Sequence, residues 1–247
     1  MSAQLRSELR KLRSTRTNLG LLVGLVALVL FGVIAGSFGS ESNLGLPEKQ
    51  RELVGNGGFA AVFAALLGVM AMTSEFRHGT IRTTFVFTPA RTRVVIAKVF
   101  ACFLVGIGFG ALGAGLALGT GALMIRTRGY EVLLDSGDVR RLLLGTIVMA
   151  ALWAALGVGI GAVLRNQVPA LVGLFAWLFV VEILLFQHVP EVARYAPAAA
   201  GTAMTGDSVG DSSVNLLSAP AGGALLALYA GASVLAGVLV TNGRDVT

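Results

Sequence analysis

Charged residues are scarce in this 247-residue sequence, because only 13% of its residues are Asp, Glu, Lys or Arg. An ordinary soluble domain has roughly 25%. With 55% apolar residues and a mean hydropathy of +0.81, the composition excludes an ordinary soluble domain and indicates an integral membrane protein. Cysteine is almost absent as well. The single Cys102 excludes an internal disulfide, and its position in an apolar run favours a small packing residue.

The sequence also lacks the motifs of several enzyme classes. It contains no G-x-x-x-x-G-K-[ST], so we expect no ATP bound by this chain, and it has no H-E-x-x-H. Its two histidines, His78 and His188, are far apart, which argues against a zinc site. The G-x-G-x-x-G at 108–113 lies inside an apolar run with no strand before it, so we interpret its glycines as a helix-packing groove. From these absences we expect that this chain is not an enzyme and that it binds no cofactor or metal itself.

The net charge of +6 does not indicate nucleic acid, because the basic residues gather at the ends of apolar stretches. Orientation in a membrane and contact with anionic lipid headgroups explain them better.

Six apolar stretches are each about long enough to cross a membrane as a helix, which takes about 20 residues. We expect one domain over residues 1–247 with spans at about 19–38, 57–73, 94–125, 142–164, 168–187 and 220–240. The third stretch is longer than a bilayer requires, so it is tilted or projects. A cleaved signal peptide is the alternative for the first stretch, but such a peptide uses about 7–15 apolar residues.

Residues 1–17 form a basic segment with apolar periodicity, since Leu5, Leu9 and Leu12 follow the spacing i, i+4, i+7. The remaining positions include Arg6, Arg10, Lys11, Arg13 and Arg16. This pattern predicts a short amphipathic helix in the membrane interface, with its leucines towards the lipid. A solvated charged tail is the alternative.

Residues 74–98 form a polar, basic connection between the second and third spans. Glu75 stands where a new helix would begin, and Pro89 favours extended geometry at Thr88. We expect a short helix that lies on the membrane face and presents Arg77, Ile81 and Arg82 to a partner.

The distribution of basic residues predicts the orientation. One side of the predicted membrane holds Arg6, Arg10, Lys11, Arg13, Arg16, Arg77, Arg82, Arg91, Arg93, Lys98, Arg165 and Arg244. The other side holds Lys49, Arg51, Arg126, Arg128, Arg140, Arg141 and Arg194. The larger set predicts that both termini are cytoplasmic, although the four arginines within 126–141 oppose the trend. In the outer connection 188–219, apolar patches at 189–193 and 214–217 suggest short interfacial helices.

Glu182 is a carboxylate within the fifth span. At the centre of a bilayer it would cost roughly 2.5–3.5 kcal/mol, so we expect it to face protein or water. It either lines a translocation path or its outer gate, or it is a structural group held by an arginine or a hydroxyl of the outer loop. We interpret Trp153 and Trp177 as packing residues or as the wall of a cavity.

Two segments, S-E-L-R-K-L-R-S-T-R at 7–16 and E-F-R-H-G-T-I-R at 75–82, resemble permease subunits of the ABC-2 family of ATP-driven exporters. Pro89, Arg91 and Lys98 extend the second segment, and the resemblance covers essentially the whole chain. It implies a bacterial plasma-membrane exporter of a drug, an antibiotic or a lipid-like amphiphile.

The resemblance also implies roles for particular residues and partners. The N-terminal segment would be an elbow helix with Leu5, Leu9, Leu12, Arg10, Lys11 and Arg13. The connection would be a coupling helix seated in an ATPase subunit through Glu75, Arg77, His78, Gly79, Thr80, Ile81 and Arg82. That ATPase would carry the ATP and Mg, and a second permease copy or a sister permease would complete the exporter.

Other classes stay open. An ion-gradient-driven transporter usually has several charges within its spans or interrupted helices in related halves, whereas here Glu182 is the clear case. A membrane hydrolase would need a nucleophile or metal set that the sequence does not show. A non-transporting anchor or immunity-type protein is a further alternative, which ATP-dependent efflux would distinguish.

Overall fold

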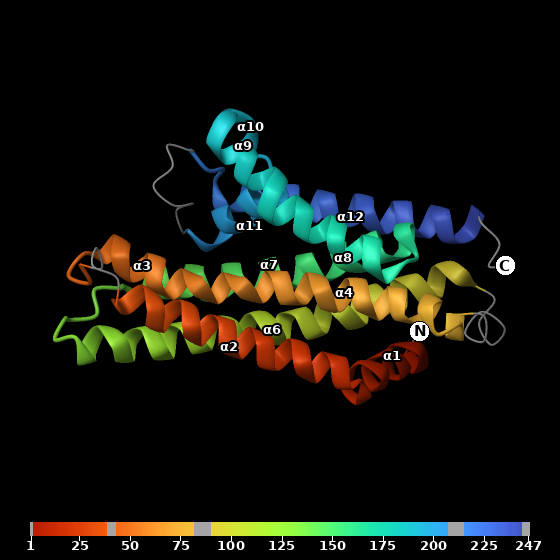
Figure 1. Ribbon diagram of the computed structural model, residues 1–247, viewed down its shortest axis with the longest axis horizontal. Helices are drawn as coiled ribbons and strands as arrows, with labels where there is room; N and C mark the ends of the chain where they lie inside the picture. The colour runs from red at the N-terminus through yellow and green to blue at the C-terminus, as the bar shows by residue number, and fades with distance from the viewer. Residues whose placement is uncertain (1, 39–42, 82–89, 207–214, 244–247) are drawn as a thin grey trace.

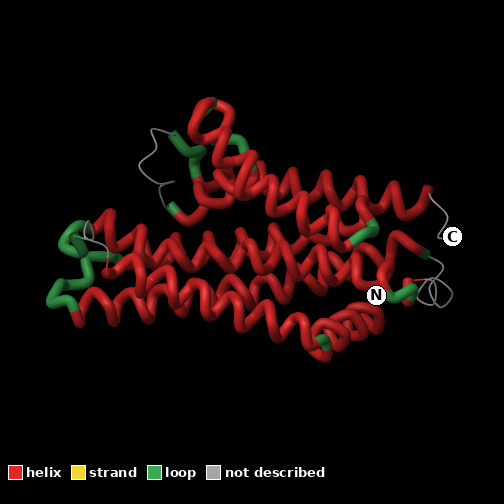
Figure 2. Tube along the Cα trace, in the orientation of Figure 1, coloured by secondary structure: helices red, strands yellow, loops and turns green. Residues whose placement is uncertain are grey.

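The computed structural model describes residues 2–38, 43–81, 90–206 and 215–243, and every regular element in these ranges is helical (Figure 2). The α-helices are α1 (Ser2–Ser14), α2 (Arg16–Phe38), α3 (Pro47–Gly55), α4 (Phe59–Arg77), α6 (Arg91–Thr127), α7 (Ser136–Leu164), α8 (Gln167–Ala176), α9 (Glu182–His188), α10 (Pro190–Ala193), α11 (Pro197–Thr205) and α12 (Ala219–Gly243). A 3-10 turn at Asn56–Gly58 joins α3 to α4, and a π-helical segment at Trp177–Val181 joins α8 to α9.

Six continuous helical stretches of the described chain are long and apolar enough to cross a membrane. They are Arg16–Phe38, Pro47–Arg77, Arg91–Thr127, Ser136–Leu164, Gln167–His188 and Ala219–Gly243. Each predicted span lies inside one of them, so the prediction of an all-helical protein with six such helices is confirmed.

The long helices run side by side along the longest axis of the molecule (Figure 1). One end, which we call the terminal end, holds α1, the end of α4, the start of α6 and the last turn of α12. The opposite end, which we call the loop end, holds α3, the connection between α6 and α7, and α9 to α11. Both termini therefore lie at the same end as the connection between α4 and α6.

Helices α4, α6 and α7 form the centre of the bundle, and small residues bring their backbones together. A side chain on Gly68 would collide with the Ala154 carbonyl, and one on Gly157 would collide with the Ala65 carbonyl. The backbones of α4 and α7 are thus in direct contact, as expected for closely packed membrane helices. Helices α2, α8 and α12 are buried over a much smaller part of their length.

The glycines of α6 divide between two faces. A Cβ on Gly106 would lie 2.9 Å from the Ala150 carbonyl oxygen, and Gly110 and Gly113 are similarly close to α7 and to Ala60. A Cβ on Gly108, Gly115 or Gly119 would meet nothing within 4 Å. The predicted packing groove is confirmed for the first set only.

The predicted connections differ most at the loop end, where helices extend beyond the apolar stretches. Helix α3 occupies part of the expected loop 39–56, and α7 begins at Ser136, where the Asp135 carboxylate accepts a hydrogen bond from the Asp138 amide (2.6 Å). Polar residues extend both helices, and the Asp135 side chain caps α7, so hydropathy alone places the helix starts too late.

The outer connection was predicted in part. The helix expected at 189–193 is α10, but residues 215–217 have no regular structure and Val214 lies outside the described residues. Helix α11 was not predicted.

Candidate functional site

Four charged side chains from three helices meet at the terminal end: Glu8 and Lys11 of α1, Glu75 of α4 and Lys98 of α6. The Lys98 Nζ lies 2.5 Å from Glu8 Oε2 and 3.0 Å from Glu75 Oε1. The Lys11 Nζ lies 2.8 Å from Glu8 Oε1 and 2.9 Å from the same Glu75 oxygen. Each lysine thus bridges both carboxylates, and we call this group the four-charge cluster.

Burial makes the cluster energetically important. The Lys98 side chain is only 3% exposed, and both carboxylate side chains are 8% exposed. Charges removed from water in this way require close opposite charges, because their desolvation is costly. The cluster therefore fixes α1 against the end of α4 and the start of α6.

The same contacts set the titration of the two α1 residues. Burial raises the pKa of the Glu8 carboxyl, but the charges of Lys98 and Lys11 and their hydrogen bonds lower it more, so its pKa lies below the ordinary 4.5. Burial lowers the pKa of Lys11, but hydrogen bonds to Glu8 and Glu75 and their charges raise it above the ordinary 10.5.

The N-terminal helix exists, but its leucine side differs from the prediction. Leu12 is buried, and Leu5 and Leu9 are half-buried against the protein core rather than directed towards lipid. The cause is the four-charge cluster, which holds that side of α1 on α4 and α6. Arg10 and Arg13 are exposed, whereas Lys11 belongs to the cluster.

The connection between α4 and α6 requires a correction at Glu75. No new helix begins there, because Glu75 lies in the last turn of α4, where it is buried by its lysine partners. Ile81 is 1% exposed and so is not presented to a partner as expected.

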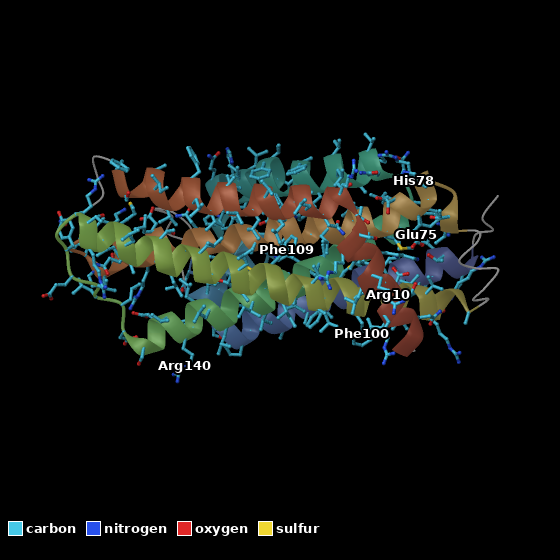
Figure 3. The ribbon with its side chains drawn as sticks, turned by 90° about the horizontal axis from the view of Figure 1, so that it is seen from below. Arg10, Glu75, His78, Phe100, Phe109 and Arg140 are labelled. Atoms are coloured by element: carbon cyan, nitrogen blue, oxygen red, sulfur yellow. The ribbon has the colours of Figure 1, made fainter. Side chains whose placement is uncertain are left out.

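Among the described residues that follow Glu75, Arg77, His78, Gly79 and Thr80 are exposed. Arg77 donates to Gln167 Oε1 (3.1 Å), and Gly79 has the left-handed φ of 67° that glycine accommodates. Figure 3 shows His78 and Glu75 at the same end as Arg10, with Arg140 at the opposite end. Arg82, Thr88 and Pro89 lie outside the described residues.

A cavity of about 600 Å³ adjoins the four-charge cluster. Its walls come from α1, the start of α2, the end of α4, Lys98 and Gln167. Leu12, Met70 and Ala71 contribute apolar surface, and Lys11 and Arg77 contribute positive charge. We call it the terminal cavity.

Glu182 is the first residue of α9, which lies away from the terminal end (Figure 1). Its side chain is 1% exposed and accepts hydrogen bonds from Trp177 Nε1 (2.7 Å) and from the Ala198 amide (3.1 Å to each carboxylate oxygen). The partners are therefore an indole and a backbone amide at the start of α11, not the arginine or hydroxyl that we expected.

The π-helical segment explains how Trp177 reaches Glu182. The two residues are five apart and would diverge on an α-helix, but an i to i+5 repeat places them on the same face. Trp177 also lines an apolar cavity of about 350 Å³ between α7, α8 and α12, together with Trp153. A role for Glu182 in a translocation path stays a prediction.

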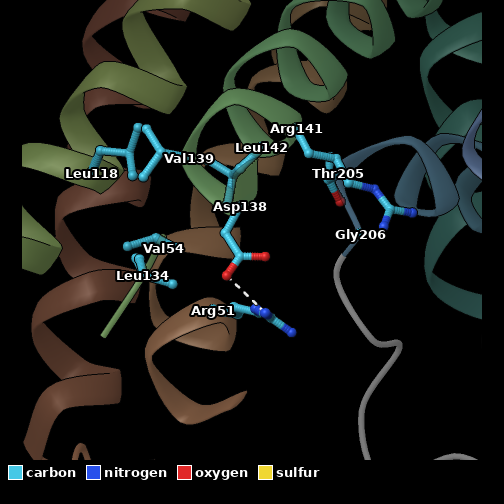
Figure 4. Close-up of a pocket in the computed structure, with 10 residues that line it drawn as sticks. All are labelled: Arg51, Val54, Leu118, Leu134, Asp138, Val139, Arg141, Leu142, Thr205 and Gly206. Atoms are coloured by element: carbon cyan, nitrogen blue, oxygen red, sulfur yellow. Dashed lines mark hydrogen bonds and ion pairs between the residues drawn. The ribbon is translucent and has the colours of Figure 1, made fainter. Parts of the chain in front are cut away.

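A further ion pair fixes the loop end. Arg51 Nη2 of α3 lies 2.7 Å from Asp138 Oδ2 of α7, beside a cavity of only about 50 Å³ (Figure 4). Arg141 also lines this space and donates to the Ala203 carbonyl (3.4 Å) of α11. These contacts connect α3, α7 and α11 and leave little room for a ligand.

Sequence reasoning missed the four-charge cluster as a unit. Two signals were present: Glu8 is the lone acid among residues 1–17, and Lys98 is a charge inside an apolar stretch. An ionisable residue inside a membrane-spanning stretch is by default a candidate functional residue. Among the described residues, no group of three or more His, Cys, Asp or Glu side chains is placed to hold a metal ion.

No family model matches this sequence, and a search of curated proteins gives no match. The likeness to ABC-2 permeases therefore rests on the two segments at 7–16 and 75–82.

Proposed function

We propose that this chain is the permease subunit of an ATP-driven exporter of the ABC-2 type, in a bacterial plasma membrane with both termini in the cytoplasm. It would form the translocation path, while a separate ATPase subunit binds ATP and Mg. A second copy or a sister permease would complete the membrane part. Its cargo would be a drug, an antibiotic or a lipid-like amphiphile.

The four-charge cluster is the observation that carries this proposal. Glu75 and Lys98 stand on either side of the 78–90 connection, and their ion pair joins α4 to α6 directly. Glu8 and Lys11 join α1 to the same pair. A force applied to the connection would therefore move the ends of three helices together, which is what a coupling element for an external motor requires.

The exposed residues beside the cluster would form the ATPase contact. Arg77, His78 and Thr80 lie at the surface of the terminal end, and Ile81 would anchor the connection in the protein. Arg10 and Arg13 on the outer side of α1 would face anionic headgroups.

Co-purification tests the proposal. The tagged chain, extracted gently from its native membrane, should bring a near-stoichiometric soluble ATPase with a phosphate-binding loop. Arg82→Glu should reduce that recovery strongly, because it reverses a charge in the proposed contact, whereas Arg140→Glu at the loop end should not. An equal recovery in both variants would remove the connection from the mechanism.

Glu182 would contribute to the outer gate, since its carboxylate joins the fifth span to the start of α11. Glu182→Gln should then lower transport. Intact transport with lowered thermal stability would instead assign Glu182 a structural role.

An ion-gradient-driven transporter is the second candidate, because Glu182, Glu75 and Lys98 are ionisable groups buried within helices long enough to span. Uptake into sealed vesicles separates the two. Transport that requires ATP and survives an uncoupler supports the exporter, and transport that collapses with the gradient supports the alternative.

A further inference from the structure

The cavity of about 350 Å³ between α7, α8 and α12 has walls that are almost entirely apolar. Both tryptophans of the sequence, Trp153 and Trp177, line it, and we call it the tryptophan cavity. Aliphatic side chains of α7 and α8 form most of the remaining wall: Leu156, Ile160, Leu164 and Leu174. These walls provide contact area for a hydrophobic ligand.

The polar side chains of the tryptophan cavity are directed to protein partners. Trp177 Nε1 donates to the Glu182 carboxylate (2.7 Å), and the Tyr229 hydroxyl donates to a backbone carbonyl just before α11 (2.9 Å). The Ser233 hydroxyl donates to the carbonyl of the preceding turn (2.9 Å), and the Trp153 indole nitrogen lies close to the backbone of α11. A polar ligand would lose its hydrogen bonds to water without replacing them, so the cavity suits an apolar chain.

The length of the tryptophan cavity matches the depth of one membrane leaflet. Trp153 and Leu164 both belong to α7 and, at 1.5 Å per residue, lie about 16 Å apart along its axis. Half of a hydrocarbon core of about 30 Å is about 15 Å. The cavity therefore extends over the depth that the acyl chains of one leaflet occupy.

The tryptophan cavity opens at the surface of the helix bundle. Gly173 and Trp177 line it and are exposed. Both belong to a helical stretch that is long and apolar enough to cross a membrane, and exposed Val172 lies beside them. The opening therefore faces acyl chains when these helices span a bilayer.

A basic residue stands at one end of the tryptophan cavity. Arg165 follows Leu164 directly, and its Nη2 donates to the Val240 carbonyl near the end of α12 (2.6 Å). This contact places that end of the cavity at the terminal end of the molecule. A basic residue at the membrane surface favours a phosphate headgroup there.

We infer that the tryptophan cavity holds one acyl chain of a phospholipid from the leaflet at the terminal end. The terminal methyl of the chain would lie between Trp153 and Trp177, and the headgroup would lie near Arg165. This inference does not rest on the proposed function, because the phospholipid is a resident of the isolated chain and not its cargo.

Intrinsic fluorescence tests the inference, because both tryptophans of the sequence line the cavity. The full chain, purified in detergent, would be titrated with a phospholipid that carries bromine beside the terminal methyl of one chain. Quenching should saturate at about one phospholipid per chain, since the cavity has the depth of a single leaflet. Quenching that rises with the ratio of lipid to detergent and never saturates would overturn the inference.

Two glycine variants test the location. A Cβ on Gly173 or on Gly231 would meet nothing within 4 Å, so leucine fits at both positions without a clash with the backbone. Gly173→Leu fills part of the cavity and should weaken phospholipid binding by about tenfold, the affinity lost when about two methylene groups are displaced. Gly231→Leu makes the same change on α12 outside the cavity wall and should leave binding unaltered. Equal effects of the two variants would contradict the location.

The position of the bromine tests how the chain lies in the cavity. Trp153 is midway along α7 and Trp177 follows the end of α8, so both are distant from the turn that joins these helices. Bromine beside the headgroup should therefore quench far less than bromine beside the terminal methyl. Equal quenching from the two positions would contradict the proposed direction of the chain.

A brominated alkyl maltoside identifies the source of the chain. This neutral detergent carries a similar chain but no phosphate, so it should bind more weakly than the phospholipid. If it saturates the quenching at the same concentration, the cavity accepts any alkyl chain and the phospholipid assignment is wrong.

Discussion

At the residue scale, Lys98 concentrates the electrostatic demands of the fold. It lies on α6, is almost fully buried, and contacts carboxylates from two other helices. A charge in this environment is stable only while its partners are present, and its partners are stable only while it is present. The ion pairs of Lys98 therefore say more about its role in the fold than does its position in an apolar stretch.

Replacement of Lys98 should destabilise the protein substantially. Lys98→Met leaves Glu8 and Glu75 with only the half-exposed Lys11, so we expect a loss of about 3–5 kcal/mol, typical of breaking a buried pair. Lys49→Met is the control, since the Lys49–Glu52 pair is exposed and should contribute less than about 1 kcal/mol. Thermal unfolding of both variants in the same detergent is the measurement. Equal midpoints would contradict the role of the cluster.

Acid should release α1. The pKa of Glu8 is lower in the folded protein than the ordinary 4.5, so its pairing stabilises α1 above that value and loses this effect as pH falls through the folded pKa. The protection factors of the α1 amides, which correct for the intrinsic exchange rate at each pH, should therefore fall below about pH 4.5. Glu8→Gln should show weak protection of α1 at neutral pH and little further change on acidification. Protection that is constant down to pH 2 in the unaltered protein would contradict this prediction.

At the element scale, the order of the six long helices could be predicted, because each crossing leaves an apolar stretch that is visible without tertiary contacts. The starts of α3 and α7 could not, because polar residues such as Glu48 and Asp138 continue helices beyond those stretches. The four-charge cluster as a unit could not be predicted from the sequence either. It joins Glu8 to Lys98 across 90 residues, and only the packing of α1 on α6 brings them together.

The π-helical segment at Trp177–Val181 is another feature that the sequence does not predict. The sequence identifies Glu182 as a charge that is costly to bury. Its hydrogen bond from Trp177, however, depends on a π-helical turn that no residue pattern predicts. The nature of a buried group's partners therefore had to come from the structure.

The two faces of α6 predict opposite effects for the same substitution. Gly106→Ala would place a methyl group 2.9 Å from the Ala150 carbonyl oxygen, so it should lower the thermal midpoint by forcing α6 and α7 apart. Gly108→Ala meets nothing within 4 Å and should leave the midpoint unchanged or raise it, since alanine favours the helix by roughly 0.5–1 kcal/mol. A lower midpoint for Gly108→Ala than for Gly106→Ala would contradict the described packing.

At the scale of the whole molecule, the two ends are built differently. The terminal end gathers α1, the four-charge cluster, the terminal cavity and both termini (Figure 1). The loop end is closed by the Arg51–Asp138 pair and by α11. Helices α2 and α12 carry large exposed apolar residues such as Phe31, Leu228 and Leu239, which suit contact with lipid or, in the proposed exporter, with a second permease.

Site-directed cross-linking tests the central proposal most directly, because it asks which end meets an ATPase. Cysteine would be introduced at exposed His78 or at exposed Arg140, each with the buried Cys102 replaced by alanine, and coupled to a photo-reactive group in native membranes. Our account predicts that the label at position 78 captures an ATPase with a phosphate-binding loop and that the label at position 140 does not. Capture from both ends alike, or of no ATPase from position 78, would contradict it.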